Sequence, residues 1–141
     1  MEFEEIQSMY REGYDCAQCI IHAFKDKLGV DEGLVMKAST CMSMGLLQGS
    51  VCGAVLGAFI IIGVKYGSTS PDLGSKGLAL IKREQFMMEF RKKYNGLTCP
   101  ELTGFDVRDS EENTKAFAAG IYDDFCPHLC LDVINILESI L

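Results

Sequence analysis

Basic residues and histidines are scarce in this sequence. Its 13 lysine and arginine residues are outnumbered by 20 aspartate and glutamate residues, which gives a formal net charge of −7. Nucleic-acid binding usually needs a basic patch, so we expect no nucleic-acid partner. The sequence has only two histidines. It contains no P-loop, dinucleotide-binding fingerprint, HExxH or GxSxG motif, so no motif indicates nucleotide binding or hydrolysis.

A signal peptide and a membrane-spanning run are also missing. The N-terminus, MEFEEIQSMYREG, is acidic and has no apolar region, so we expect a cytoplasmic protein with reduced thiols. No charge occurs between Lys37 and Lys65, but glycines and Gln48 interrupt this interval. Its unbroken apolar part, 51–64, has 14 residues. A bilayer-spanning helix needs about 20 residues, so this length favours a buried core helix.

The chain shows no run with the alternating pattern of a strand, and its apolar residues recur with helical spacing. We predict an all-α fold, with residues 1–141 as a single-domain bundle of five to seven helices around a central apolar helix over 51–66, capped by Ser50. The expected helices cover residues 3–12, 16–28, 32–44, 51–66, 76–95, 110–120 and 127–141, with Asp15 and Asp31 as N-caps. The predicted buried side of the 76–95 helix is Ile81, Met87, Met88, Phe90 and Tyr94.

Seven cysteines occur in the 141 residues. This is about 5%, below the ~8–10% of a secreted disulfide scaffold. Because the number is odd, a complete intramolecular set of disulfides is impossible. The cysteines are therefore small buried hydrophobes, metal ligands or redox thiols.

Four cysteines from separate segments fall at expected helix N-termini. Cys16 opens a helix, and Cys52 lies in the first turn of another. Cys99 and Cys126 each precede a proline, and because proline is favoured at the first helical position, both are predicted N-caps. The unpaired N–H groups and positive end of a helix favour a thiolate, so this placement predicts a lowered cysteine pKa, for redox chemistry or for metal binding.

The other three cysteines are predicted to fill the core: Cys19, Cys41 and Cys130. The Cys16–Cys19 pair forms a CxxC without a following histidine, so we expect no c-type haem. Gly53 and Gly57 form a GxxxG pair, which lets a neighbouring helix or a bound group approach the backbone closely.

The cysteine-containing segments resemble one known family. CGAVLG at 52–57 matches a CGAxxG core, and GYDCAQCIIHAF, LTCPELTG and FCPHLCLDVINILESIL resemble the blocks that carry Cys16, Cys99 and Cys126. These are the segments of the C_GCAxxG_C_C family, whose small, mainly helical members are described as redox-active. The resemblance implies a redox class of function without a substrate. The segment CMSMGLLQGS at 41–50 departs from the family pattern, because it lacks the basic residue often found before CGAxxG. This absence argues against an anion-binding role for the segment.

The sequence supports three hypotheses. In the first, Cys16, Cys52, Cys99 and Cys126 converge near Gly53 and Gly57 and either cycle between dithiol and disulfide or hold an iron–sulfur cluster, with a protein or small molecule as redox partner. In the second, the same four cysteines hold a structural zinc ion. In the third, the chain is a helical interaction protein with core cysteines. A homodimer through the 51–64 helix is compatible with all three.

Overall fold

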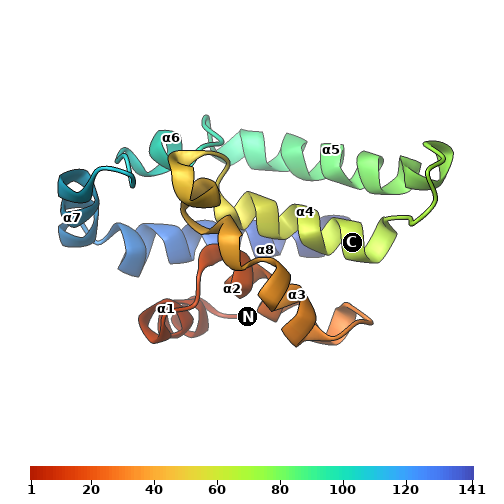
Figure 1. Ribbon diagram of the computed structural model, residues 1–141, viewed down its shortest axis with the longest axis horizontal. Coiled ribbons are helices and arrows are strands. Elements are labelled where there is room, and N and C mark those ends of the chain that lie inside the picture. Colours follow the sequence, from red (N-terminus) through yellow and green to blue (C-terminus); the bar gives the residue numbers. More distant parts are fainter.

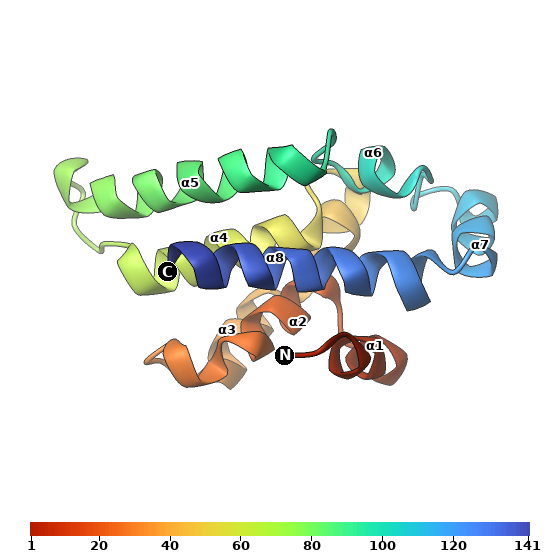
Figure 2. The ribbon, with the colours of Figure 1, turned by 180° about the vertical axis from the view of Figure 1, so that it is seen from behind.

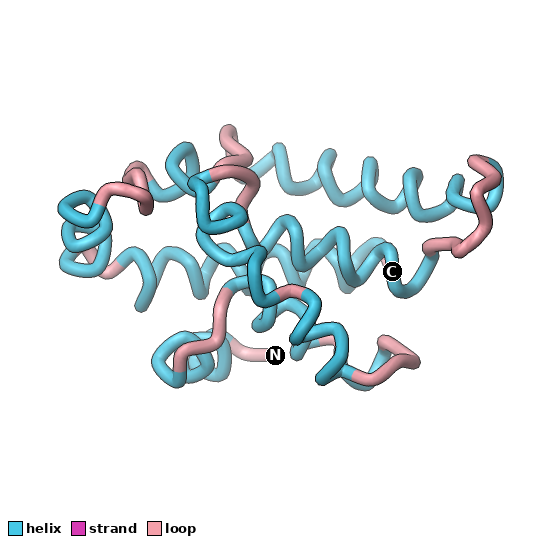
Figure 3. The backbone as a smooth tube through the Cα atoms, in the orientation of Figure 1, coloured by secondary structure: helices cyan, strands magenta, loops and turns pink.

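The computed structural model describes residues 1–141 and contains eight α-helices. These are α1 (Phe3–Glu12), α2 (Cys16–Ala23), α3 (Glu32–Ala38), α4 (Gly53–Tyr66), α5 (Gly77–Lys93), α6 (Cys99–Thr103), α7 (Ser110–Ala118) and α8 (Cys126–Ile140). There is no strand, and the one extended pairing is an isolated bridge between Val51 and Thr98 (Figure 3). The predicted all-α class is confirmed.

The helices form three levels in the view of Figure 1. The long helix α5 runs along one side, α4 and α8 lie below it, and α1, α2 and α3 cover the opposite side, as the reverse view also shows (Figure 2). Short α6 and α7 close one end of the molecule, where the N-terminal end of α8 also lies. No helix combines the length and apolarity needed to cross a bilayer.

One apolar core of 21 buried residues joins α1, α2, α4, α5 and α8. Its largest fully buried side chains include Phe24, Phe86 and Phe90. Burying a side chain of this kind contributes about 1.5–3 kcal/mol to folding. The all-helical arrangement therefore rests mainly on this shared core.

The face that α5 buries differs from the prediction. Met87 and Phe90 are buried as expected, but Ile81 is 56% exposed and Met88 is 63% exposed. Ile81 and Met88 are seven residues apart, so they share one helix face. Because α5 is an outer helix whose main packing partners are α4 and α8, this face is left in solvent, and the sequence-based prediction was wrong for these two residues.

The start of α4 also differs from the prediction. Ser50 does not cap the helix; Cys52 is the N-cap, and the helix begins at Gly53. The reason is a tertiary one, because the Cys52 N–H donates to the Leu97 carbonyl at 2.9 Å and the Cys99 N–H donates to the Ser50 carbonyl at 2.9 Å. This pairing holds residues 50–52 in an extended conformation.

Helices α2 and α4 pack closely against each other at Gly57. A Cβ atom added at Gly57 would lie 3.0 Å from the Cβ of Ile20 and 3.1 Å from the Cα of Ala17. A side chain at this position would push the two helices apart. The GxxxG pair thus has the close-packing role expected of it at Gly57.

Candidate thiol site

The end of the bundle that carries α6 and α7 contains a cavity of about 280 Å³. All four cysteines predicted from helix ends line it, from four separate segments of the chain, together with Gly53. A fifth cysteine, Cys130, lines it as well. Gly57 does not, because it is covered by α2. All seven cysteines are free thiols in this structure.

Cys16 is fixed by the cap of α2 and by the absence of a side chain at Gly53. The Asp15 carboxylate accepts the Gln18 N–H at 2.9 Å, as predicted, and Gln18 Oε1 accepts the Asp15 N–H at 3.2 Å. A Cβ atom added at Gly53 would overlap the Cys16 Sγ and would lie 2.9 Å from the Met42 carbonyl oxygen. Gly53 therefore leaves the space that the Cys16 sulfur occupies.

A left-handed backbone turn approaches the same sulfur. Met44, Leu46 and Leu47 have φ values of 51°, 58° and 57°, a region that costs roughly 1–2 kcal/mol per residue without glycine. Met44 lines the cavity. Burial raises the pKa of the Cys16 thiol, and the backbone N–H of Met44 opposes this rise without outweighing it. Strain of this kind is often found at functional sites.

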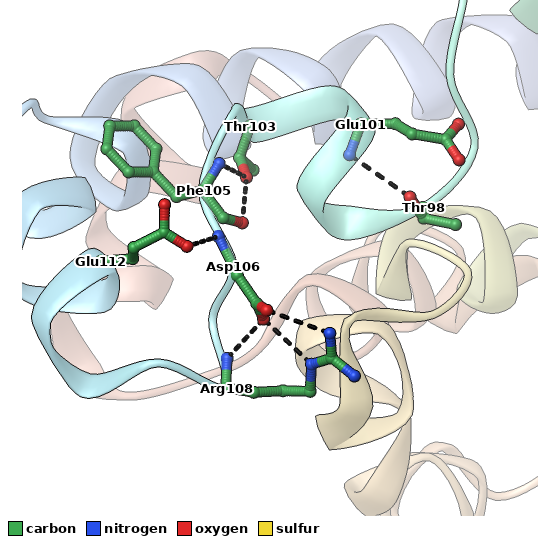
Figure 4. Close-up of polar contacts among 7 residues, drawn as sticks. All are labelled: Thr98, Glu101, Thr103, Phe105, Asp106, Arg108 and Glu112. Carbon is green, nitrogen blue, oxygen red and sulfur yellow. Dashed lines mark hydrogen bonds and ion pairs between the residues drawn. The ribbon is translucent and has the colours of Figure 1, made fainter.

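Cys99 is the first residue of α6, but it is not the predicted N-cap. Thr98 is the cap, and its Oγ1 accepts the Glu101 N–H at 3.3 Å (Figure 4). Thr103 Oγ1 in turn donates to the Cys99 carbonyl at 2.8 Å. Pro100 is therefore the second residue of the helix rather than the first, so the prediction missed the cap by one residue.

The loop after α6 is held by its own polar contacts (Figure 4). The Asp106 carboxylate accepts two hydrogen bonds from the Arg108 guanidinium at 3.0 Å each, and the Asp106 N–H donates to Glu112 Oε2 at 3.0 Å. These contacts fix the start of α7 and with it Phe117, which lines the cavity.

Cys126 is also not an N-cap, because a π-helical turn over Ile121–Phe125 runs directly into α8. Pro127 has no N–H to donate to the Asp123 carbonyl one turn back. The Gln7 side chain of α1 supplies this hydrogen bond instead, with its Nε2 2.7 Å from the Asp123 oxygen. Helical structure therefore continues through the position where the proline predicted a start.

Cys130 was predicted to be core, and it is fully buried. It also faces the cavity, one turn along α8 from Cys126. The Tyr10 hydroxyl lies 3.4 Å from its Sγ, and the Cys130 thiol is 3.9 Å from the Cys16 carbonyl oxygen. The four-residue spacing from Cys126 was the sequence signal for this shared face.

Burial raises the pKa of every cavity thiol, opposite to the direction predicted from helix ends. Desolvation raises the pKa of Cys99 to about 11, and it also raises the pKa of Cys16, Cys126 and Cys130. At Cys52 the N–H groups of Ala54 and Val55 lower the pKa but do not outweigh burial. The prediction considered the helix end without the low-polarity cavity that surrounds it.

A charge on Cys52 acts on the other four cavity thiols. A thiolate at Cys52 raises the pKa of Cys16, Cys99, Cys126 and Cys130, in each case by less than burial does. Ionisation of Cys52 therefore favours the protonated form of its neighbours.

Thiolate sulfur suits zinc or an iron–sulfur cluster. In this structure, however, no group of three or more His, Cys, Asp or Glu side chains is arranged to hold a metal ion. The sulfurs as placed here do not form a ligand set, so we derive no step through a metal.

Cys19 and Cys41 do not line the cavity, and neither do the two histidines of the chain. Cys19 is buried as predicted. Cys41 is exposed, and its prediction as a core residue was wrong because residues 40–42 form a surface 3-10 turn. His22 pairs with Glu32 at 2.6 Å, and His128 lies 3.4 Å from Asp124.

Comparison with known proteins gives one match. A family model described as "Putative redox-active protein (C_GCAxxG_C_C)" matches residues 14–140, which include every cavity cysteine. No curated protein and no solved structure matches the chain.

Proposed function

This chain belongs to the C_GCAxxG_C_C family, and from that premise we propose that its cavity is a redox site in which cysteine thiols are oxidised in pairs to disulfides and reduced again. One observation carries the proposal: cysteines from four separate segments of the chain line a single cavity. Cys19, by contrast, lies in the apolar core and does not line the cavity.

We assign Cys52 the role of the attacking thiol. It is the N-cap of α4, where the N–H groups of Ala54 and Val55 favour its thiolate. Its charge acts on Cys16, Cys99 and Cys126, which line the same cavity, and we propose one of these three as the partner that completes the disulfide.

A small disulfide reagent oxidises the cavity thiols in two exchange steps. The Cys52 thiolate attacks one sulfur of the reagent, which breaks the reagent S–S bond and releases one thiolate. A second cavity thiol loses its proton and attacks the mixed disulfide, which forms an intramolecular S–S bond and releases the second thiolate. Two electrons pass from the chain to the reagent, and the two released thiolates take up the two protons.

Thiol counting and disulfide mapping test this proposal. The reduced chain is freed of reductant without oxygen, treated with 2-hydroxyethyl disulfide and mapped by mass spectrometry, with iron and zinc measured on the same sample. We expect disulfides only among cavity cysteines, two thiols lost for each disulfide formed, and reversal by dithiothreitol. The Cys41→Ser variant is the matched control, because Cys41 is exposed and lies outside the cavity.

The contrary result is oxidation confined to Cys41, or cavity thiols that stay reduced until the chain unfolds. A stoichiometric metal bound by the same cysteines in the purified protein also overturns disulfide cycling.

A further inference from the structure

We infer that the cavity binds a small uncharged quinone, which accepts the two electrons that the cysteine thiols release; this inference rests on the proposed redox function. The size of the cavity, its lining, its charge and its free hydrogen-bond donors favour such a ligand.

The cavity is small and largely apolar. Its volume of about 280 Å³ is just below the usual range of ligand pockets, which is about 300–1,000 Å³. Of its 18 lining residues, 13 are hydrophobic. A ligand of one or two rings fits such a space, whereas a peptide does not.

Aromatic rings supply much of this lining. Five aromatic residues line the cavity: Tyr10, Tyr14, Phe117, Tyr122 and Phe125. Phe117 and Tyr122 lie with their ring centroids 4.5 Å apart, and Phe117 is 63% exposed, which places it at the mouth. Planar ligands pack well on aromatic faces and edges, so the lining favours a ring over an aliphatic chain.

The charge of the lining excludes an anion. No lysine, arginine or histidine lines the cavity, and Asp15 is its one carboxylate. Binding a carboxylate or phosphate without a cation or a set of N–H donors would carry a desolvation cost of several kcal/mol. Glutathione disulfide, which is anionic and larger, is therefore a poor fit.

Hydroxyl groups can orient an uncharged acceptor. Tyr14, two residues before Cys16, and Ser43 line the cavity, and each hydroxyl can donate to a carbonyl oxygen. The Tyr10 hydroxyl is already placed against Cys130, and the Tyr122 hydroxyl donates to Asn113 Oδ1 at 2.5 Å. A quinone matches this set, because it has two carbonyl acceptors, no donor and no charge.

The electron balance with a quinone is complete. Two S–H bonds of the chain break and one S–S bond forms. The two electrons and two protons pass to the two carbonyl oxygens, which become the hydroxyl groups of the hydroquinone. No further oxidant is needed.

Duroquinone (tetramethyl-p-benzoquinone) is the probe, because its four methyl groups block addition of a thiol to the ring. The reduced chain is mixed with it without oxygen, and hydroquinone formation is followed by absorbance alongside the thiol count. We expect one hydroquinone for every two thiols lost. Phe117→Ala should lower the rate about tenfold, which corresponds to about 1.4 kcal/mol. Met88→Ala is the matched control, because Met88 is also 63% exposed but lies outside the cavity.

Comparing oxidation by 2-hydroxyethyl disulfide with oxidation by duroquinone separates this inference from the proposed function. Oxidation by 2-hydroxyethyl disulfide without any oxidation by duroquinone overturns the quinone inference and leaves the redox function intact. Equal rates for the Phe117→Ala and Met88→Ala variants also overturn it, because the quinone then reacts without entering the cavity. No oxidation by either reagent overturns both.

Discussion

The two halves of α4 and α8 have different surroundings. At their N-terminal ends these helices contribute Cys52, Gly53, Cys126 and Cys130 to a cavity, whereas their later turns contribute Ile61, Ile62, Val133 and Ile134 to a close-packed core. The same helices thus serve two purposes. The later turns fix the positions of the two helices through the core. The N-terminal ends hold cysteine side chains beside the cavity, where cysteines from other segments also lie.

The largest effect on stability is expected in the packed half. Phe90 is fully buried and stacks on Phe86, with ring centroids 5.8 Å apart. Phe90→Ala should lower the free energy of unfolding by about 3–5 kcal/mol, measured by urea denaturation. Met88→Ala, on the exposed face of the same helix, should change it by less than about 0.5 kcal/mol. Equal losses for both variants would contradict the assignment of the buried face.

A smaller loss of stability and a larger change in thiol chemistry are expected at the boundary between the halves. An alanine at Gly53 would overlap the Cys16 sulfur, so Gly53→Ala should cost about 1–3 kcal/mol and change the rate at which Cys16 is alkylated. Gly63→Ala is the control, because nothing lies within 4 Å of a Cβ added there. An unchanged alkylation rate at Cys16 in a folded Gly53→Ala chain would show that this contact is unimportant.

The hydrogen bond from Gln7 to the Asp123 carbonyl, which replaces the one that Pro127 cannot donate, should contribute modestly to the free energy of unfolding. Gln7→Ala removes the donor to the Asp123 carbonyl and should cost about 0.5–1.5 kcal/mol, again by urea denaturation. Gln85→Ala, at an exposed position of α5, should be neutral. If Gln7→Ala is equally neutral, water replaces the side chain and the π-helical turn does not depend on α1.

Titration of the Cys99 thiol should have the smallest effect on the free energy of unfolding at neutral pH. Its pKa rises from 9.0 to about 11 on folding because the thiol is desolvated. The folded state therefore keeps a proton that the unfolded chain releases, and the resulting stability is fully present below pH 9 and is lost between about pH 9 and 11. The Cys99→Ser variant should lose less stability than the native chain over this interval, measured by denaturation at each pH. Parallel losses would contradict the burial of this thiol.

Local features of the fold could be predicted from sequence. Asp15 and Asp31 cap their helices because the required side chain and N–H group are three residues apart. The set of four cysteines followed from helix-start residues and from the family pattern, and the structure places all four at one cavity. Short-range spacing was sufficient for the two aspartate caps, whereas the predicted N-cap positions of Cys99 and Cys126 were wrong.

Features that depend on distant contacts could not be predicted. The continuation of helix through Pro127 needs Gln7 from the other end of the chain, and the position of Cys52 needs the pairing with Leu97. The direction of the thiol pKa shifts depends on burial in the assembled cavity, which outweighs the local helix end that the sequence reveals. Only the assembled cavity determines that balance.

The most direct test of the central claim is a redox titration of the folded chain in dithiothreitol buffers of defined composition, with disulfides mapped at each point. The account predicts a reversible two-electron transition that links Cys52 to another cavity cysteine and is lost in Cys52→Ser but kept in Cys41→Ser. A folded chain whose cavity cysteines remain thiols at every buffer ratio would contradict it.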